Sequence, residues 1–182
     1  MITKFRLYEK IETEPDWKSD KKVRDIIKAR NLIKSSVNLN QKDSNGWLPL
    51  KVATSSDIEV MKMLITAGAK PNVEIFNYLM PPTMGGGTDN VNAKAKLLID
   101  TGFDLNDKNI DDQTPLICAA VCNQINVMRY LLNAGADPFI MDSQNKCFID
   151  HLNKQNFNKI KNEYPEIYDE YLMRKDAGKY NL

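Results

Sequence analysis

The sequence predicts an all-α solenoid of helix–turn–helix units, and three observations support this fold class. Proline recurs at a fixed interval, because Pro49, Pro82 and Pro115 are separated by 33 residues (82 − 49 and 115 − 82). Each expected second helix ends in a pair of aliphatic residues, and a glycine follows three residues after each pair. These are Leu64-Ile65 with Gly68, Leu98-Ile99 with Gly102, and Leu131-Leu132 with Gly135. A short helix pair cannot bury its apolar face alone, so a fixed repeat predicts stacked neighbours that share one core.

The stretch from Asn109 to Phe139 shows the repeating unit most clearly. Thr114 is a good N-cap, because its hydroxyl can accept from an unpaired N–H of the first turn, and Pro115 suits the first helical position. A short apolar helix is then expected over residues 116–120. Gly135 suits the left-handed stop of a second helix. The apolar face of that second helix is Ile125, Met128, Leu131 and Leu132.

Several stretches in register resemble the ankyrin-repeat family, whose repeats each combine a β-turn with two helices. The stretches that carry the resemblance are DSNGWLPLKVA (Asp43–Ala53), LITAGAKPN (Leu64–Asn72), LIDTGFDLN (Leu98–Asn106), TPLICAA (Thr114–Ala120) and LLNAGADP (Leu131–Pro138). The resemblance implies an ankyrin-repeat solenoid with β-hairpin fingers and about five repeats, including degenerate terminal caps. It also implies a non-enzymatic module that recognises a protein with its concave face, lined by the fingers and the first helices.

A single ankyrin-repeat domain is expected over residues 1–182. Its first part is an N-terminal capping region, in which LIKSSVNLN (Leu32–Asn40) mirrors LITAGAKPN 32 residues later (64 − 32). Its last part is a C-terminal repeat followed by a capping helix that begins after Pro165. The expected boundaries are 1–40 for the N-terminal cap, 41–72, 73–106 and 107–139 for the repeats, and 140–182 for the C-terminal repeat and capping helix.

The repeat from Val73 to Asn106 keeps the period but loses the expected content. Its first helix should begin at Pro82, yet three consecutive glycines follow at 85–87, and each would cost about 1 kcal/mol in a helix interior relative to alanine. Two interpretations are open: a loop replaces this helix, or small residues are needed because something packs closely. The apolar stretch 75–81 just before the glycines is expected to form the projecting hairpin finger.

Charge and composition exclude several classes of protein. The net charge is +1, from 25 basic and 24 acidic residues, so nothing marks a nucleic-acid binder, and no apolar run suggests a signal peptide or a membrane span. Three cysteines form no disulfide framework and suit a reducing compartment. We expect a cytoplasmic protein, of the producing cell or of a host, that is a monomer when unbound. The bias towards lysine and asparagine hints at a bacterial source.

Catalytic chemistry is not expected. The single histidine, His151, is expected to be structural, and Cys118 and Cys122 lie four residues apart without a second pair of metal ligands. No metal and no cofactor are therefore expected. An enzyme that uses Cys122 or His151 is the remote alternative. More specific forms of the binding hypothesis are an inhibitor or immunity protein for a cognate toxin, and a secreted effector that binds a host protein.

The candidate partner-binding residues come from outward-facing positions of the family and from large apolar side chains that occupy them. The surface is expected to centre on Trp47, Tyr78 and Met80, because stacking should bring Trp47 and Tyr78 to one face. An alternative is that Trp47 folds down onto the neighbouring finger and fills a gap. The full set is Asn45, Trp47, Phe76, Tyr78, Met80, Ile110, Asp111, Gln113 and Met141.

Overall fold

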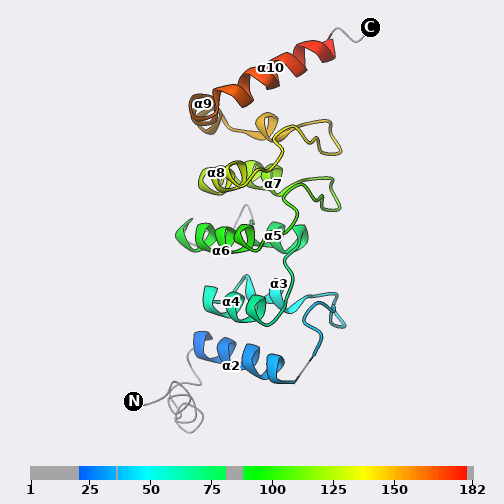
Figure 1. Ribbon diagram of the computed structural model, residues 1–182, viewed down its shortest axis with the longest axis vertical. Helices are drawn as coiled ribbons and strands as arrows, with labels where there is room; N and C mark the ends of the chain where they lie inside the picture. Colours follow the sequence, from blue (N-terminus) through cyan, green and yellow to red (C-terminus); the bar gives the residue numbers. More distant parts are fainter. Residues whose placement is uncertain (1–20, 36, 81–87, 180–182) are drawn as a thin grey trace. The chain divides into compact units, whose positions relative to one another are not determined.

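The computed structural model describes residues 21–35, 37–80 and 88–179 (Figure 1). This described part is helical and contains no β-strand, which confirms the predicted all-α class. The chain divides into two compact units, residues 1–70 and 71–182. The predicted single domain stays a prediction.

The first unit contains α2 (Lys21–Lys34), α3 (Pro49–Ala53) and α4 (Ile58–Thr66). Helix α4 packs against both α2 and α3. The core of this unit is apolar and includes Leu50, Val60, Met61 and Leu64, all nearly inaccessible to solvent. The Asp57 carboxylate caps α4 by accepting a hydrogen bond from the Glu59 N–H. The predicted stop at Gly68 is confirmed, because this glycine has a φ of +100° directly after the helix.

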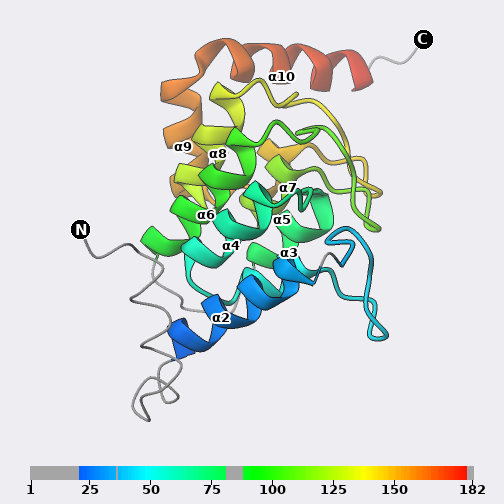
Figure 2. The same cartoon turned by 60° about the horizontal axis from the view of Figure 1, so that its bottom comes forward.

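The second unit continues the same alternation of first and second helices, which Figures 1 and 2 show from two sides. The first helices α5, α7 and η2 form one row, in which α7 contacts both neighbours. The second helices include α6 and α8, which contact each other, and α9 packs against the last helix, α10. The bounds are α5 (Val73–Leu79), α6 (Thr88–Asp100), α7 (Pro115–Val121), α8 (Ile125–Asn133), η2 (Phe148–His151), α9 (Lys154–Glu163) and α10 (Pro165–Lys179).

Helix α7 begins as the sequence predicts. The Thr114 hydroxyl accepts a hydrogen bond from the Ile117 N–H at 3.3 Å, and Pro115 occupies the first turn. Residues 115–120 are all buried between the neighbouring helices. Gly135 has a φ of +90° after α8, which confirms the predicted left-handed stop.

The prediction of a hairpin finger over 75–81 is wrong, because the first helix of this repeat, α5, begins at Val73. The Asn72 side chain caps α5 by accepting from the Ile75 N–H at 3.0 Å. The expected helix start at Pro82 and the three glycines lie outside the described residues. The physical reason for the early helix is Ile75, whose side chain has no oxygen that could accept the hydrogen bonds of a finger.

Candidate protein-binding surface

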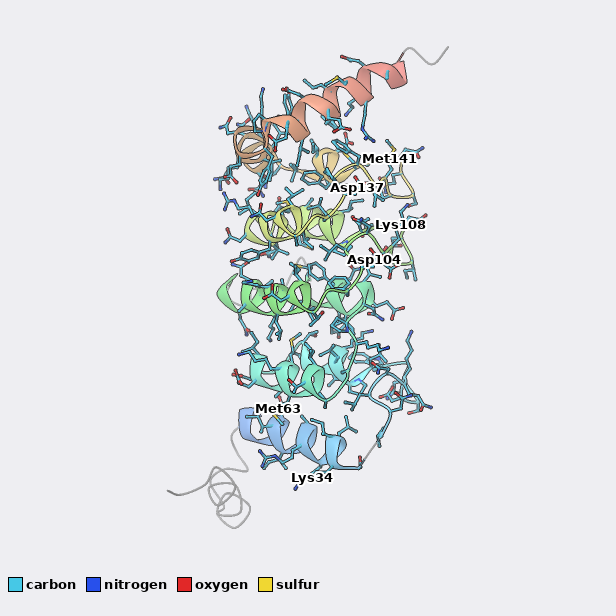
Figure 3. All side chains as sticks on the ribbon, viewed as in Figure 1. Lys34, Met63, Asp104, Lys108, Asp137 and Met141 are labelled. Carbon is cyan, nitrogen blue, oxygen red and sulfur yellow. The ribbon has the colours of Figure 1, made fainter. Side chains whose placement is uncertain are left out.

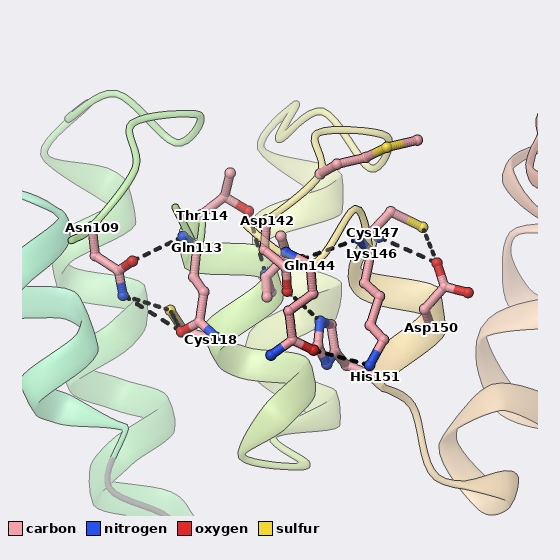
Figure 4. Close-up of polar contacts among 12 residues, drawn as sticks. Asn109, Gln113, Thr114, Cys118, Asp142, Gln144, Lys146, Cys147, Asp150 and His151 are labelled. Atoms are coloured by element: carbon pink, nitrogen blue, oxygen red, sulfur yellow. Dashed lines mark hydrogen bonds and ion pairs between the residues drawn. The ribbon is translucent and has the colours of Figure 1, made fainter. Parts of the chain in front are cut away.

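Three described loops share one hydrogen-bonding pattern, and these loops are the fingers. Each begins with Asp43, Asn109 or Asp142, whose side-chain Oδ1 accepts from the backbone N–H groups two and four residues later. These six distances lie between 2.8 and 3.1 Å, and Figure 4 shows the second and third fingers. The backbone N–H of the first residue also donates to the carbonyl four residues later, so the loop is closed at its base.

A left-handed residue turns each finger at the same place. Gly46, Asp112 and Asn145 have φ values of +75°, +58° and +56°, and their N–H groups donate to the carbonyl of the first finger residue. Glycine adopts this conformation freely, and aspartate and asparagine tolerate it better than other side chains. Each finger is therefore a rigid turn rather than a pair of hydrogen-bonded strands.

The same pattern explains why the third repeat, from Val73 to Asn106, has no finger before its first helix α5. Asn109 and Asp142 each lie seven residues after a helix-stop glycine (109 − 102 and 142 − 135), and seven residues after Gly68 stands Ile75. Isoleucine has no acceptor for the two N–H groups that the turn leaves unpaired. The chain instead satisfies its N–H groups in a helix, and Ile75 is completely buried there.

The tips of the second and third fingers, residues 107–113 and 140–146, form what we call the finger surface. The Lys108 ammonium donates to the Met141 carbonyl oxygen at 2.8 Å, so the two tips lie side by side (Figure 3). Below them, the Asn106 side chain accepts from the Asp137 N–H at 2.8 Å. Ile110 is 94% exposed and Met141 is 49% exposed. The finger surface therefore presents two large apolar side chains on two fingers that are joined by a hydrogen bond.

The remaining predicted residues of this unit divide into exposed and buried ones. Tyr78 on α5 is 43% exposed, and Asp111 at the finger tip is exposed. Gln113 is half-buried, and its side-chain oxygen accepts from the Cys118 thiol. The placement of Phe76 and Met80 on the surface is wrong, because they are 0% and 3% exposed.

The burial of Phe76 and Met80 follows from the unexpected helix α5. The Phe76 ring lies 5.8 Å from the Phe103 ring, between centroids, and the Met80 carbonyl oxygen accepts from the Cys122 thiol. Both side chains are therefore part of the core that α5 shares with its neighbours.

In the first unit, Trp47 and Asn45 lie on the first finger, and both are exposed. Trp47 is at 36% exposure, with the Lys51 ammonium 4.8 Å from its ring centroid. Its ring lines a groove of about 580 Å³ whose walls also include Leu32, Val52 and residues of α4. Trp47 belongs to the first unit and Tyr78 to the second, so the expectation that they share one face stays a prediction.

Sequence reasoning missed three features of the surface. Lys108 links the fingers, and no sequence pattern indicates this, because the bond goes to a backbone carbonyl. Leu172 and Met173 on α10 are 40% and 67% exposed. The available signal was helical spacing, because Tyr168 and Tyr171 lie on one half-buried face of α10, with ring centroids 6.4 Å apart.

The cysteines lie in surroundings that suppress the thiolate. Burial raises the pKa of the Cys118 thiol to about 12, and burial also raises the pKa values of Cys122 and Cys147. A reactive cysteine needs the opposite shift, since the thiolate is the nucleophile. The Cys122 thiol is moreover occupied as a donor to the Met80 carbonyl.

His151 is held by a finger residue. Its Nε2 lies 2.7 Å from Oδ2 of Asp142, whose side chain is only 3% exposed (Figure 4). Burial acts to raise the pKa of Asp142, but hydrogen bonds from the Lys146 and Gln144 N–H groups and from His151 outweigh it, so this pKa is lowered. The pair fixes the third finger to η2, which is a structural role.

The part of the chain that the structure describes offers neither a cluster of metal ligands nor a helix that could span a membrane. No group of three or more histidine, cysteine or acidic side chains there could hold a metal ion. Among the same residues, no helix combines the length and apolar character needed to cross a membrane.

Comparison with known proteins agrees with this architecture. A family model of ankyrin repeats, in three copies, matches residues 84–142. An ankyrin repeat protein of Acanthamoeba polyphaga mimivirus is 27% identical over 135 residues, covering 62% of this chain and 83% of the viral protein. The human transient receptor potential cation channel subfamily A member 1 is 31% identical over 101 residues, covering 55% of this chain. The match spans 9% of that channel, a small part of its length.

The repeat period, the stacked helix pairs and these matches together support an ankyrin-repeat architecture for this chain. Ankyrin repeats form protein–protein interaction modules, and the family typically consists of non-enzymatic binding modules.

Proposed function

We propose that this chain is a non-enzymatic recognition module that binds a partner protein through its fingers and the exposed sides of its first helices. The observation that carries the proposal is Ile110, which is 94% exposed at the tip of a finger. The transfer of an isoleucine side chain from water into apolar surroundings is favourable by about 1.5–3 kcal/mol of free energy. A partner that covers Ile110 gains this contribution.

The rigidity of the finger surface supports the same proposal. Six hydrogen bonds hold the second and third fingers: two within each finger and two that connect them, including the Lys108 bond to the Met141 carbonyl. Association is opposed by the entropy of ordering loops and side chains at the interface. A finger that is already ordered avoids most of that cost, so its apolar tip can act as an anchor.

The proposed contact residues follow from exposure. In the second unit they are Ile110, Met141, Asp111 and Tyr78, and Gln113 orients the finger through its bond with the Cys118 thiol. In the first unit they are Trp47 and Asn45 on the first finger. The free cysteines of the described chain support a reducing compartment, so we place the protein in a cytoplasm.

Affinity capture with substituted bait proteins tests the proposal. The bait would be the full chain, compared with Ile110→Ser and with Tyr130→Ser as the control, since Tyr130 is 37% exposed on the second helix α8. We expect Ile110→Ser to lose the specifically captured protein and Tyr130→Ser to keep it, with unchanged melting temperatures for both. Equal capture by all three baits would refute a role for the finger surface.

A further inference from the structure

Four aspartates lie in the second finger or at its base, close in sequence to the exposed Ile110. Asp104, Asp107, Asp111 and Asp112 are all exposed between residues 104 and 112, and the same stretch has one basic residue, Lys108. Four acids against one lysine give this stretch a net charge of −3, whereas the whole chain carries +1. The second finger and its base therefore carry a local negative charge.

The described part of the protein places no basic side chain in an ion pair with these four carboxylates. Ion pairs do form on the helices, such as Lys96 with Asp100 on α6. The ammonium of Lys108 is directed to the Met141 carbonyl oxygen of the next finger, at 2.8 Å. Figure 3 shows Lys108 and Met141 on neighbouring fingers, with Asp104 and Asp137 at their bases.

We propose that the finger surface binds a protein segment in which lysine or arginine side chains flank an apolar side chain. The inference deepens the proposed function and depends on it. The apolar group of the partner covers Ile110 and Met141, and its cations pair with Asp107, Asp111 and Asp112. A neutral partner would desolvate these carboxylates without compensation, which costs free energy. Complementary charges instead raise the association rate and exclude acidic partners.

A random-peptide library displayed on phage, selected on the immobilised full chain, tests the inference. We expect the selected peptides to be enriched in lysine and arginine around one apolar residue. One selected peptide is then synthesised, and its Kd is measured for each variant by fluorescence anisotropy. Because exposed charges are screened by salt, we also expect the Kd to rise between low and physiological ionic strength.

The charge variant uses residues that the chain itself has at the same finger positions. Asp111→Asn copies Asn45 of the first finger, and Asp112→Asn copies Asn145 of the third, which is also left-handed. The double variant therefore keeps the turn and removes two charges. We expect it to weaken peptide binding about tenfold. The control, Asp100→Asn with Asp169→Asn, removes two exposed charges from helices α6 and α10 and should leave the Kd unchanged.

Ile110→Ser separates this inference from the proposed function. If Ile110→Ser weakens binding but the Asp111/Asp112 variant binds like the wild type, the proposal of a basic partner is refuted. The proposal that the finger surface is the binding site is then supported. If the selected peptides are neutral or acidic, the basic partner is refuted as well. If no selected peptide depends on Ile110, both the partner class and the proposed surface are refuted.

Discussion

Replacing Asp142 by alanine should strongly destabilise the second unit. Its side chain accepts from the Gln144 N–H at 2.8 Å and the Lys146 N–H at 3.1 Å, and it lies 2.7 Å from Nε2 of His151. Each such hydrogen bond contributes about 1 kcal/mol, and the partners left behind are partly buried. We therefore expect Asp142→Ala to lower the free energy of unfolding by about 3 kcal/mol, measured by urea denaturation followed by circular dichroism.

Asp142→Asn is the matched variant, because Asn109 already holds the second finger with an amide oxygen. We expect it to cost about 1 kcal/mol. The folded-state pKa of Asp142 is lowered, so its charge stabilises the fold above the usual aspartate pKa of about 3.9 and loses this effect as the pH falls through the folded value. The difference between wild type and Asp142→Asn should therefore shrink below about pH 4. If alanine is tolerated as well as asparagine, the side chain does not hold the finger.

Three more predictions concern the core and the domain. Phe76→Ala should lower the free energy of unfolding by about 3–5 kcal/mol and Tyr78→Ala by less than about 0.5 kcal/mol, because Phe76 is buried and Tyr78 is exposed. If urea denaturation gives similar losses for both variants, the position of α5 is contradicted. Cys118→Ser should cost about 1–2 kcal/mol, whereas a chelator should leave the melting temperature unchanged, and a stoichiometric metal found by elemental analysis would refute the structural role. If residues 1–182 form one domain, calorimetry should show a single transition with equal calorimetric and van't Hoff enthalpies, and two separate transitions would refute this.

The regular repeats could be predicted because their signals are local. Thr114 and Pro115 define the start of α7 through a capping bond and a fixed φ, and Gly135 defines the end of α8. Such features act within one turn of helix, so they can be read without knowing the neighbours. The exposure of Ile110 and Met141 was predictable for the same reason, because both occupy tips of turns with recognisable acidic or amide first residues.

The third repeat could not be predicted from its period, because the period does not show which loop can form. The proline spacing places a first helix at Pro82, but the structure has α5 at Val73–Leu79. An apolar stretch of this length fits either a projecting finger or a buried helix, and periodicity alone does not distinguish them. The residue at position 75 distinguishes them, since a finger needs an oxygen acceptor there and isoleucine has none.

The loss of this finger determines the extent of the finger surface in the second unit. With an acceptor at position 75, Phe76 and Tyr78 would stand on a projecting loop, as Ile110 does. With isoleucine there, the chain buries Phe76 and places Tyr78 on the side of α5, while the next two fingers remain linked by Lys108. Among the described residues of this unit, the second finger with Ile110 at its tip is thus the first projecting element, and the finger surface extends from it to the third finger.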